Sequence, residues 1–158
     1  MASPFPLKFL PLPQNKRFFG RAAELEEISD RLNPSNPILT SRGSRSVLIH
    51  GMGGVGKTQL ALQYAYTRGD RYDAVFWIRC DTMIALSQSC YEIVQSLGLV
   101  ETELSTAVVY FTRWLANTST GIALAFSLCS NMYSSAISPH YGQRRASWHY
   151  IIHTANQT

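Results

Sequence analysis

The sequence is poor in cysteine, and its few cysteines are not spaced as a metal site or a disulfide framework. Cys80, Cys90 and Cys129 are an odd number, and no two of them form a Cys-x-x-Cys pair. No histidine lies near them at a metal-ligand spacing. A zinc-stabilised domain and a disulfide-stapled secreted domain are therefore excluded. We expect reduced, mostly buried thiols in a cytoplasmic protein.

Long hydrophobic runs are also lacking. The longest one, residues 122–129, is far shorter than the roughly 20 apolar residues that span a bilayer. Residues 1–17 contain four prolines and have no apolar centre of the kind found in a signal peptide. We expect them to be a Pro-rich lead-in without regular structure, and we expect no membrane partner.

Charged residues are few, and they form no basic stripe. They make up 15% of the 158 residues, whereas apolar residues make up 46%, a balance typical of one globular domain. The net charge is +4, but the 14 lysines and arginines are scattered and are not interleaved with aromatic residues. This distribution favours an ordinary basic surface over a nucleic-acid partner.

The apolar periodicity of the central region predicts alternating strands and helices. Strands are expected at residues 46–50 and 74–78, and both read as buried on two faces because their apolar runs are continuous. In the first strand, His50 is expected to be a packed core residue rather than a base. Helices are expected at residues 22–32, 57–66, 84–97 and 103–116. This order predicts an α/β fold with a parallel sheet and right-handed crossovers.

One motif with specific chemistry stands between the first strand and the helix that follows it. The run Gly51-Met52-Gly53-Gly54-Val55-Gly56-Lys57-Thr58 matches the pattern G-x-x-x-x-G-K-[ST] of a phosphate-binding P-loop. Glycines permit positive φ, so that consecutive backbone N–H groups face one concavity, and the helix N-terminus adds positive potential. Lys57 can reach the β- and γ-phosphates, and the Thr58 hydroxyl can ligate Mg²⁺. The sequence therefore predicts binding of ATP or ADP with Mg²⁺, rather than a glycine-rich turn without a ligand.

The surrounding residues resemble a known family. Residues 51–61, which extend the loop through Gln59, resemble the P-loop of NB-ARC proteins. These belong to the signal-transduction ATPases called STAND NTPases, which act in fungi and plants as NOD-like receptors. Residues 18–25 resemble the family's segment of two hydrophobic residues followed by Gly-Arg-x-x-Glu-Leu, and residues 72–79 resemble its second strand in fungal members. The resemblance implies a three-layer P-loop NTPase fold, with residues 18–117 as a partial NB-ARC domain.

The same resemblance extends the candidate site beyond the loop. In the family, the Gly-Arg segment lies against the adenine and the ribose, so Phe18, Phe19 and Arg21 become candidate base contacts. The alternative is that the two phenylalanines form a hydrophobic staple for the helix that follows. Both interpretations stay open. The predicted nucleotide-binding residues from the loop itself are Gly51, Met52, Gly53, Gly54, Val55, Gly56, Lys57, Thr58 and Gln59, with Thr58 as the metal ligand.

Acidic residues are missing where the family requires them. The family next supplies a third strand that ends in acids, the Walker B element, which holds Mg²⁺ and polarises water. This sequence has no acid after Glu103, and residues 121–130, at about that place, end in serine and cysteine. We therefore expect an incomplete, truncated family member with little or no hydrolysis. Residues 118–158 are expected to be a divergent tail, disordered or translated out of frame, or alternatively a third strand and a loop.

Three functions are compatible with these observations. The first is a nucleotide-binding module of a NOD-like signalling switch protein in the cytoplasm, with protein partners in a signalling complex. The second is a catalytic P-loop ATPase or kinase, and the missing acid counts against it. The third is a non-functional fragment, which the sequence alone does not separate from the first.

Overall fold

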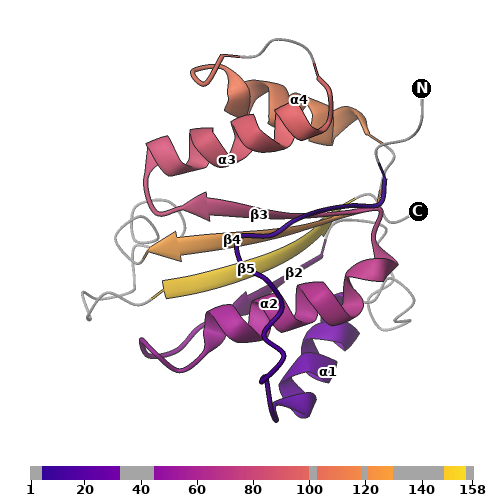
Figure 1. Ribbon diagram of the computed structural model, residues 1–158, viewed down its shortest axis with the longest axis vertical. Coiled ribbons are helices and arrows are strands. Elements are labelled where there is room, and N and C mark those ends of the chain that lie inside the picture. Colours follow the sequence, from indigo (N-terminus) through magenta and orange to yellow (C-terminus); the bar gives the residue numbers. More distant parts are fainter. Residues whose placement is uncertain (1–4, 33–44, 100–102, 119–120, 130–147, 156–158) are drawn as a thin grey trace.

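The protein has three layers, with a central sheet covered by two helices on each face. The computed structural model describes residues 5–32, 45–99, 103–118, 121–129 and 148–155. Helices α3 and α4 lie on one face of the sheet, and α1 and α2 lie on the other (Figure 1).

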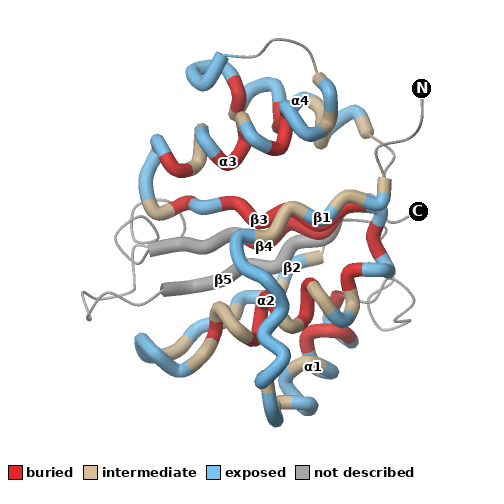
Figure 2. Tube along the Cα trace, in the orientation of Figure 1, coloured by how far each residue is buried: buried red, intermediate tan, exposed pale blue. Residues whose placement is uncertain are grey.

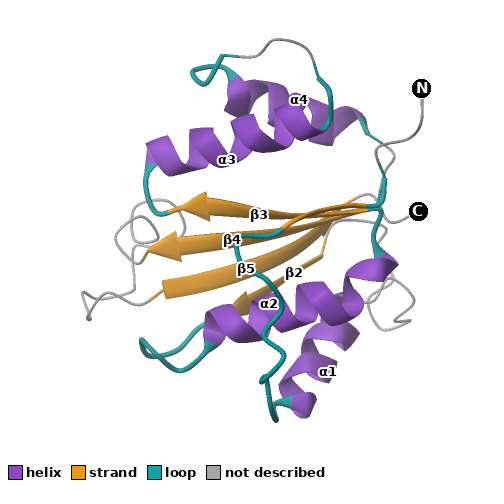
Figure 3. Cartoon of the chain, viewed as in Figure 1, coloured by secondary structure: helices purple, strands orange, loops and turns teal. Residues whose placement is uncertain are grey.

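The sheet has five strands in the order β1-β3-β4-β5-β2, and Figure 3 shows them between the helices. Strands β1, β3 and β4 are parallel, whereas β5 is antiparallel to both of its neighbours, β4 and β2. Because β2 and β4 are both antiparallel to β5, β2 points the same way as β4 and therefore as β3. The strands are β1 (Leu7–Phe9), β2 (Arg45–Ile49), β3 (Ala74–Cys80), β4 (Ile122–Cys129) and β5 (Trp148–Ala155). The predicted α/β fold of the P-loop NTPase type is confirmed.

The helices agree with the sequence prediction to within a few residues. They are α1 (Ala22–Leu32), α2 (Lys57–Arg68), α3 (Met83–Ser96) and α4 (Ala107–Asn117), and a short 3₁₀ turn, Gly69–Arg71, follows α2. Helix α3 begins at a side-chain cap, because the Thr82 hydroxyl accepts the Ala85 N–H at 3.1 Å. Helix α4 begins later than predicted, since Glu103 and Thr106 close a turn in which the Thr106 N–H donates to the Glu103 carbonyl.

The core is built on β3, whose side chains alternate between two buried clusters. Val75 and Trp77 point toward α1 and α2, whereas Phe76 and Ile78 point toward α3 and α4. The continuous apolar run of residues 74–78 fits this position, because β3 is buried on both faces of the sheet along these residues. The Phe76 ring meets the Trp114 ring edge-on, with centroids 6.0 Å apart.

Strand β2 departs from its predicted burial. Val47 and Ile49 pack toward α1 and α2, but Leu48 is 41% exposed and His50 is also exposed. The cause is its position at the edge of the sheet, away from β3, on which α3 packs. The predictions of a strand buried on two faces and of a packed core histidine are therefore wrong, although the strand itself is confirmed.

The prediction that the N-terminal lead-in has no regular structure is wrong, because it contains strand β1. Leu7–Phe9 pairs in parallel with β3, and Leu7 and Phe9 pack against the cluster under α3 and α4. Proline cannot donate to a sheet ladder, but Pro6 and Pro11 flank this short edge strand instead of interrupting it. The Lys8 ammonium also contacts the Asp70 carboxylate at 2.7 Å.

Two stretches of the predicted tail belong to the sheet. The alternative that residues 118–158 supply a third strand is confirmed at β4, whose register runs from Ile122 opposite Ala74 to Leu128 opposite Cys80. Strand β5 was not predicted. Residues 119–120, 130–147 and 156–158, to which the expectation of disorder or a shifted frame also applied, lie outside the described residues.

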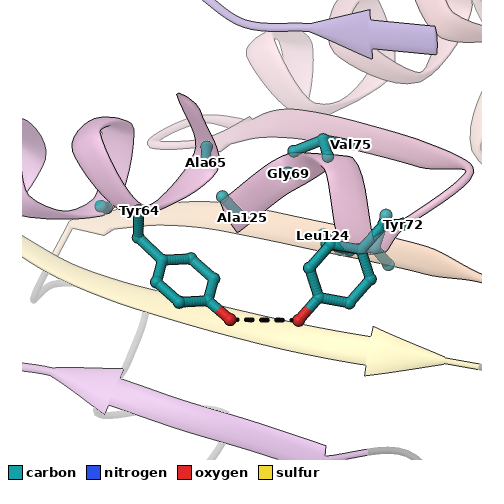
Figure 4. A pocket seen from close by; sticks show the side chains of 9 residues that line it. Tyr64, Ala65, Gly69, Tyr72, Val75, Leu124 and Ala125 are labelled. Atoms are coloured by element: carbon teal, nitrogen blue, oxygen red, sulfur yellow. Dashed lines mark hydrogen bonds between the residues drawn. The ribbon is translucent and has the colours of Figure 1, made fainter. Parts of the chain in front are cut away.

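A buried tyrosine pair and a small cavity beside it belong to the packing of the core and not to a ligand site. The hydroxyls of Tyr64 and Tyr72 lie 3.1 Å apart, and burial together with this hydrogen bond raises the pKa of Tyr64 (Figure 4). The cavity beside them has a volume of about 10 Å³ and an apolar lining, so it is too small for more than a water molecule.

The described cysteines are buried thiols, as the sequence predicted. Cys80 and Cys90 are both free and buried. Burial raises the pKa of Cys80 to about 12 and that of Cys90 to about 11. Both side chains therefore stay protonated at neutral pH and behave as small apolar residues.

Removing the centre of the aromatic cluster tests this packing. We expect Phe76→Ala to lower the free energy of unfolding by about 3–5 kcal/mol, because Phe76 is 0% exposed and its loss leaves a cavity. Urea denaturation followed by circular dichroism measures the change. Val109→Ala is the control: Val109 is 65% exposed on α4, so its effect should stay within about 0.5 kcal/mol. Equal losses in the two variants would contradict the described core.

Candidate functional site

The glycine-rich loop lies between β2 and α2, at the carboxyl edge of the strands that point the same way. Strand β2 ends at Ile49 and α2 begins at Lys57, so residues 50–56 form the connection (Figure 3). In open α/β sheets, ligands bind at this edge, where backbone amides and helix N-termini converge. The predicted phosphate loop therefore stands in the place that phosphate binding requires.

The loop backbone uses conformations that require glycine. Gly51, Gly54 and Gly56 have φ values of 149°, 78° and 86°. Side-chain-bearing residues seldom adopt positive φ, because their Cβ then crowds the backbone. The tight curvature of the loop thus depends on glycine at these three positions.

The first turn of α2 presents backbone N–H groups to the loop. Gly56 is the N-cap in a left-handed conformation, and no side chain caps the helix there. The Leu60 N–H is the first to close an intrahelical bond, to the Gly56 carbonyl at 2.9 Å. The N–H groups before it have no acceptor within the helix, so they form the positive end of the helix dipole. An anion is stabilised at such a terminus.

The Lys57 side chain is buried inside the loop and binds two of the loop's carbonyls. Its side chain is only 6% exposed, and its ammonium donates to the Gly51 carbonyl at 2.8 Å and to the Met52 carbonyl at 2.7 Å. The start of the loop is therefore tied to the start of the helix. A buried ammonium at this place attracts phosphate oxygens strongly, since little water screens it.

The structure brings Arg21 to the same loop. The Arg21 guanidinium donates to the Val55 carbonyl at 2.6 Å, and Arg21 itself has a left-handed φ of 55°. The two phenylalanines before Arg21 differ in burial. Phe18 is half-buried against the core under α1 and α2, which favours the staple alternative for it, whereas Phe19 is 97% exposed.

The segment between β1 and α1 lies across α2 (Figure 2). The Tyr66 hydroxyl donates to the Leu12 carbonyl at 2.7 Å. The Asn15 amide donates to the Gln59 side chain at 3.1 Å, one residue beyond the Lys57-Thr58 pair. The sequence predicted Gln59 at the site but gave no signal for Asn15, because no local pattern links two residues so far apart in the chain.

An open pocket of about 650 Å³ extends from the loop along β2 and under α1. Most of the residues that line it outside the loop were not predicted from the sequence. A helical spacing does place several of them on one face of α1, and this signal was available. The pocket is lined by Arg21, Glu24, Glu27, Ile28 and Arg31 of the α1 region, Ser46–Ile49 of β2, and His50, Gly51, Met52, Val55, Lys57 and Leu60.

The chemistry of the loop suits a metal ion held jointly with phosphate. Thr58 is half-buried in the first turn of α2, where its hydroxyl can serve as one oxygen ligand. Within the described parts of the chain, no three His, Cys, Asp or Glu side chains group as a metal site. Mg²⁺ keeps several waters and takes few protein ligands when phosphates supply the others, so the residues present fit a nucleotide-held Mg²⁺.

Comparison with known proteins agrees with this geometry. The profile of the family described as AAA ATPase domain matches residues 17–141. The chain belongs to that family. AAA ATPase domains are P-loop NTPase modules, so the match supports a nucleotide-binding NTPase module.

One curated relative is named a nucleotide-binding leucine-rich repeat (NLR)-like protein, from Hyaloscypha variabilis (strain UAMH 11265 / GT02V1 / F). It is 34% identical over 86 residues, which are 53% of this chain and 8% of the relative. The chain thus spans a small part of that protein's length. No solved structure matches the chain significantly. Among the described residues, no helix is long and apolar enough to cross a membrane.

The carboxyl end of β4 differs from the Walker B strand that the sequence resemblance led us to look for. It ends at Leu128 and Cys129, and neither residue carries a carboxylate. Moreover, β5 lies between β4 and β2, so β4 is two strand spacings, roughly 9–10 Å, from the loop-bearing strand. The carboxylates that the structure does bring near the loop come from α1, at Glu24 and Glu27.

Two adjacent glycines test the loop conformation. We expect Gly54→Ala to destabilise the fold by about 1–2 kcal/mol, because its φ of 78° disfavours any side chain. Gly53→Ala is the matched control, since Gly53 lies outside the left-handed region and an added Cβ meets no atom within 4 Å at either position. Its effect should stay within about 0.5 kcal/mol. Urea denaturation of both variants gives the comparison, and equal losses would refute the assigned backbone.

Proposed function

We propose that this chain is a nucleotide-binding module of a NOD-like signalling switch protein, binding ADP or ATP with Mg²⁺. The observation that carries the proposal is the loop itself, in which left-handed glycines, a helix N-terminus and the buried Lys57 ammonium converge. The NLR-like name of the relative supports the signalling context. Residues 18–117 would form the NB-ARC part, with a divergent tail after it, in a cytoplasmic protein with protein partners.

The proposed complex assigns each part of the nucleotide to described residues. The β- and γ-phosphates lie in the loop from Gly51 to Gly56, with Lys57 as their counter-charge and the Thr58 hydroxyl on Mg²⁺. The base and ribose lie in the pocket under α1. Phe18, Phe19 and Arg21 remain the candidate contacts to them, and of these three Arg21 lines the pocket.

We further propose that hydrolysis is negligible. Phosphoryl transfer needs a group that orients water and a metal held in place, and these are usually carboxylates. The strand that could supply one ends in Leu128 and Cys129. A signalling protein that switches by holding a bound nucleotide needs little ATP hydrolysis.

A second candidate function, ATP hydrolysis, is favoured by the description of the family and by two carboxylates. Glu24 and Glu27 both line the pocket beside the loop. Glu27 pairs with Arg31 at 2.9 Å, whereas Glu24 has no hydrogen-bond or ion-pair partner in the described part of the chain. Glu24 is therefore the carboxylate to test if turnover is found.

Thermal melts test the binding proposal. At a ligand concentration one hundredfold above Kd, binding adds about 2.7 kcal/mol to stability. For a chain of this size, we expect Mg²⁺ with ADP or ATP to raise Tm by roughly 5–10 °C. Lys57→Ala should reduce the rise to about 1–2 °C, because the buried ammonium no longer meets the phosphates. The rise is measured against each variant's own ligand-free Tm, since Lys57 also holds the loop.

The control for this experiment is Lys16→Ala. It removes the same charge from an exposed side chain with no hydrogen bond or ion pair in the described structure, and its ligand-induced rise should equal that of the wild type. A wild-type protein that is folded but shows no rise at millimolar nucleotide would refute the proposed function. The non-functional fragment would then be the better description.

Turnover is the second measurement. We expect phosphate release from ATP below about 0.01 per second, far under the median enzyme rate of roughly 10 per second. A coupled phosphate assay on the purified chain measures it. A rate near ordinary enzyme values that Lys57→Ala abolishes would favour the ATPase alternative, and Glu24→Gln would then show whether α1 supplies the carboxylate.

A further inference from the structure

We propose that Arg21 is a positioning residue for the phosphate loop, acting through the Val55 carbonyl rather than through the base. The inference rests on the proposed function, since it concerns how the same loop binds phosphate. It assigns to Arg21 a role different from the adenine contact that the sequence resemblance implies. The observation that carries it is the 2.6 Å hydrogen bond from the Arg21 guanidinium to the Val55 carbonyl.

The geometry of one peptide unit explains why this bond matters. In a trans peptide, the C=O of one residue and the N–H of the next point in opposite directions. The Val55–Gly56 peptide is trans, and its carbonyl points to Arg21, so the Gly56 N–H is directed away from the guanidinium. A flip of this peptide would replace a donor in the loop by an oxygen, which repels phosphate.

Nothing intrinsic to Gly56 holds that peptide in place. Glycine populates positive and negative φ about equally, and an added Cβ at Gly56 would meet only the end of the Arg21 side chain, at 3.9 Å. The guanidinium therefore provides the constraint that the glycine lacks. A charge-assisted hydrogen bond to a backbone carbonyl is strong enough for this purpose.

Arg21 is itself fixed from both sides. On one side, its carbonyl accepts the Leu25 N–H at 3.1 Å in the first turn of α1. On the other, Phe18 packs into the core, and Asn15 is held by Gln59 of α2. Its left-handed φ of 55° is uncommon for arginine and carries strain that surrounding contacts must offset. The guanidinium is thus anchored on the same helices that frame the loop.

A ligand without a base separates the two roles of Arg21. Pyrophosphate with Mg²⁺ occupies the loop but has neither ribose nor adenine. If Arg21 orients the loop, its loss weakens pyrophosphate and ADP by the same factor. If Arg21 contacts the base, its loss weakens ADP and leaves pyrophosphate unchanged.

The decisive variant is Arg21→Gly in the full chain, because glycine accepts the left-handed backbone and removes only the side chain. Arg17→Gly is the matched control: it deletes the same charge from the same segment, and in the described structure the Arg17 side chain makes no hydrogen bond or ion pair. Arg21→Lys restores a cationic donor. Isothermal titration calorimetry gives Kd for Mg²⁺-ADP and Mg²⁺-pyrophosphate in each variant, after Tm has verified folding.

We expect Arg21→Gly to weaken both ligands about tenfold, the lower range for a hydrogen bond to a charged group. Arg17→Gly should leave both within about twofold, and Arg21→Lys should return both to within about threefold. A loss confined to ADP, or no loss for either ligand, would overturn the inference while the proposed function stands. If Arg21→Gly is unfolded at the temperature of measurement, Arg21→Gln is judged by the same criteria. Absence of binding in the wild type would instead reject the proposed function.

Discussion

The buried ammonium of Lys57 is the interaction on which the rest of the site depends. It joins the first two carbonyls of the loop to the first residue of α2, so strand, loop and helix act as one unit. A buried charge is stable only when its hydrogen bonds are satisfied, and the loop carbonyls supply them. The glycines follow from this constraint, because the backbone must turn tightly enough to present Gly51 and Met52 to a side chain only a few residues ahead.

Much of this arrangement could be predicted from the sequence because its determinants are local. The motif specifies its own turn, and the helical spacing of Leu60, Ala61, Tyr64 and Ala65 specifies the face of α2 that is buried. The P-loop, both flanking elements and the α/β class were therefore predictable. Candidate base contacts at Phe18, Phe19 and Arg21 came from resemblance alone and stay a prediction.

The parts that could not be predicted depend on contacts between distant residues. No local signal shows that Asn15 meets Gln59, that Leu7 and Phe9 join β3, or that β2 lies at an edge. The continuous apolar run of residues 46–50 is typical of a strand buried on both faces, yet its position in the sheet decides its burial. Strand β5 had no recognisable signature and was missed, although it separates β4 from β2.

The position of β2 also has a consequence for the order in which the site can form. Its only ladder partner in the described sheet is β5, and Arg45 pairs with Thr154 across most of the length of the chain. Contacts between residues so distant in sequence form slowly, because loop closure opposes them until other structure is in place. During synthesis the loop-bearing strand must therefore wait until residues 148–155 leave the ribosome, whereas α3 and α4 can dock on β3 earlier. The nucleotide loop is thus completed late, on a scaffold that has already formed.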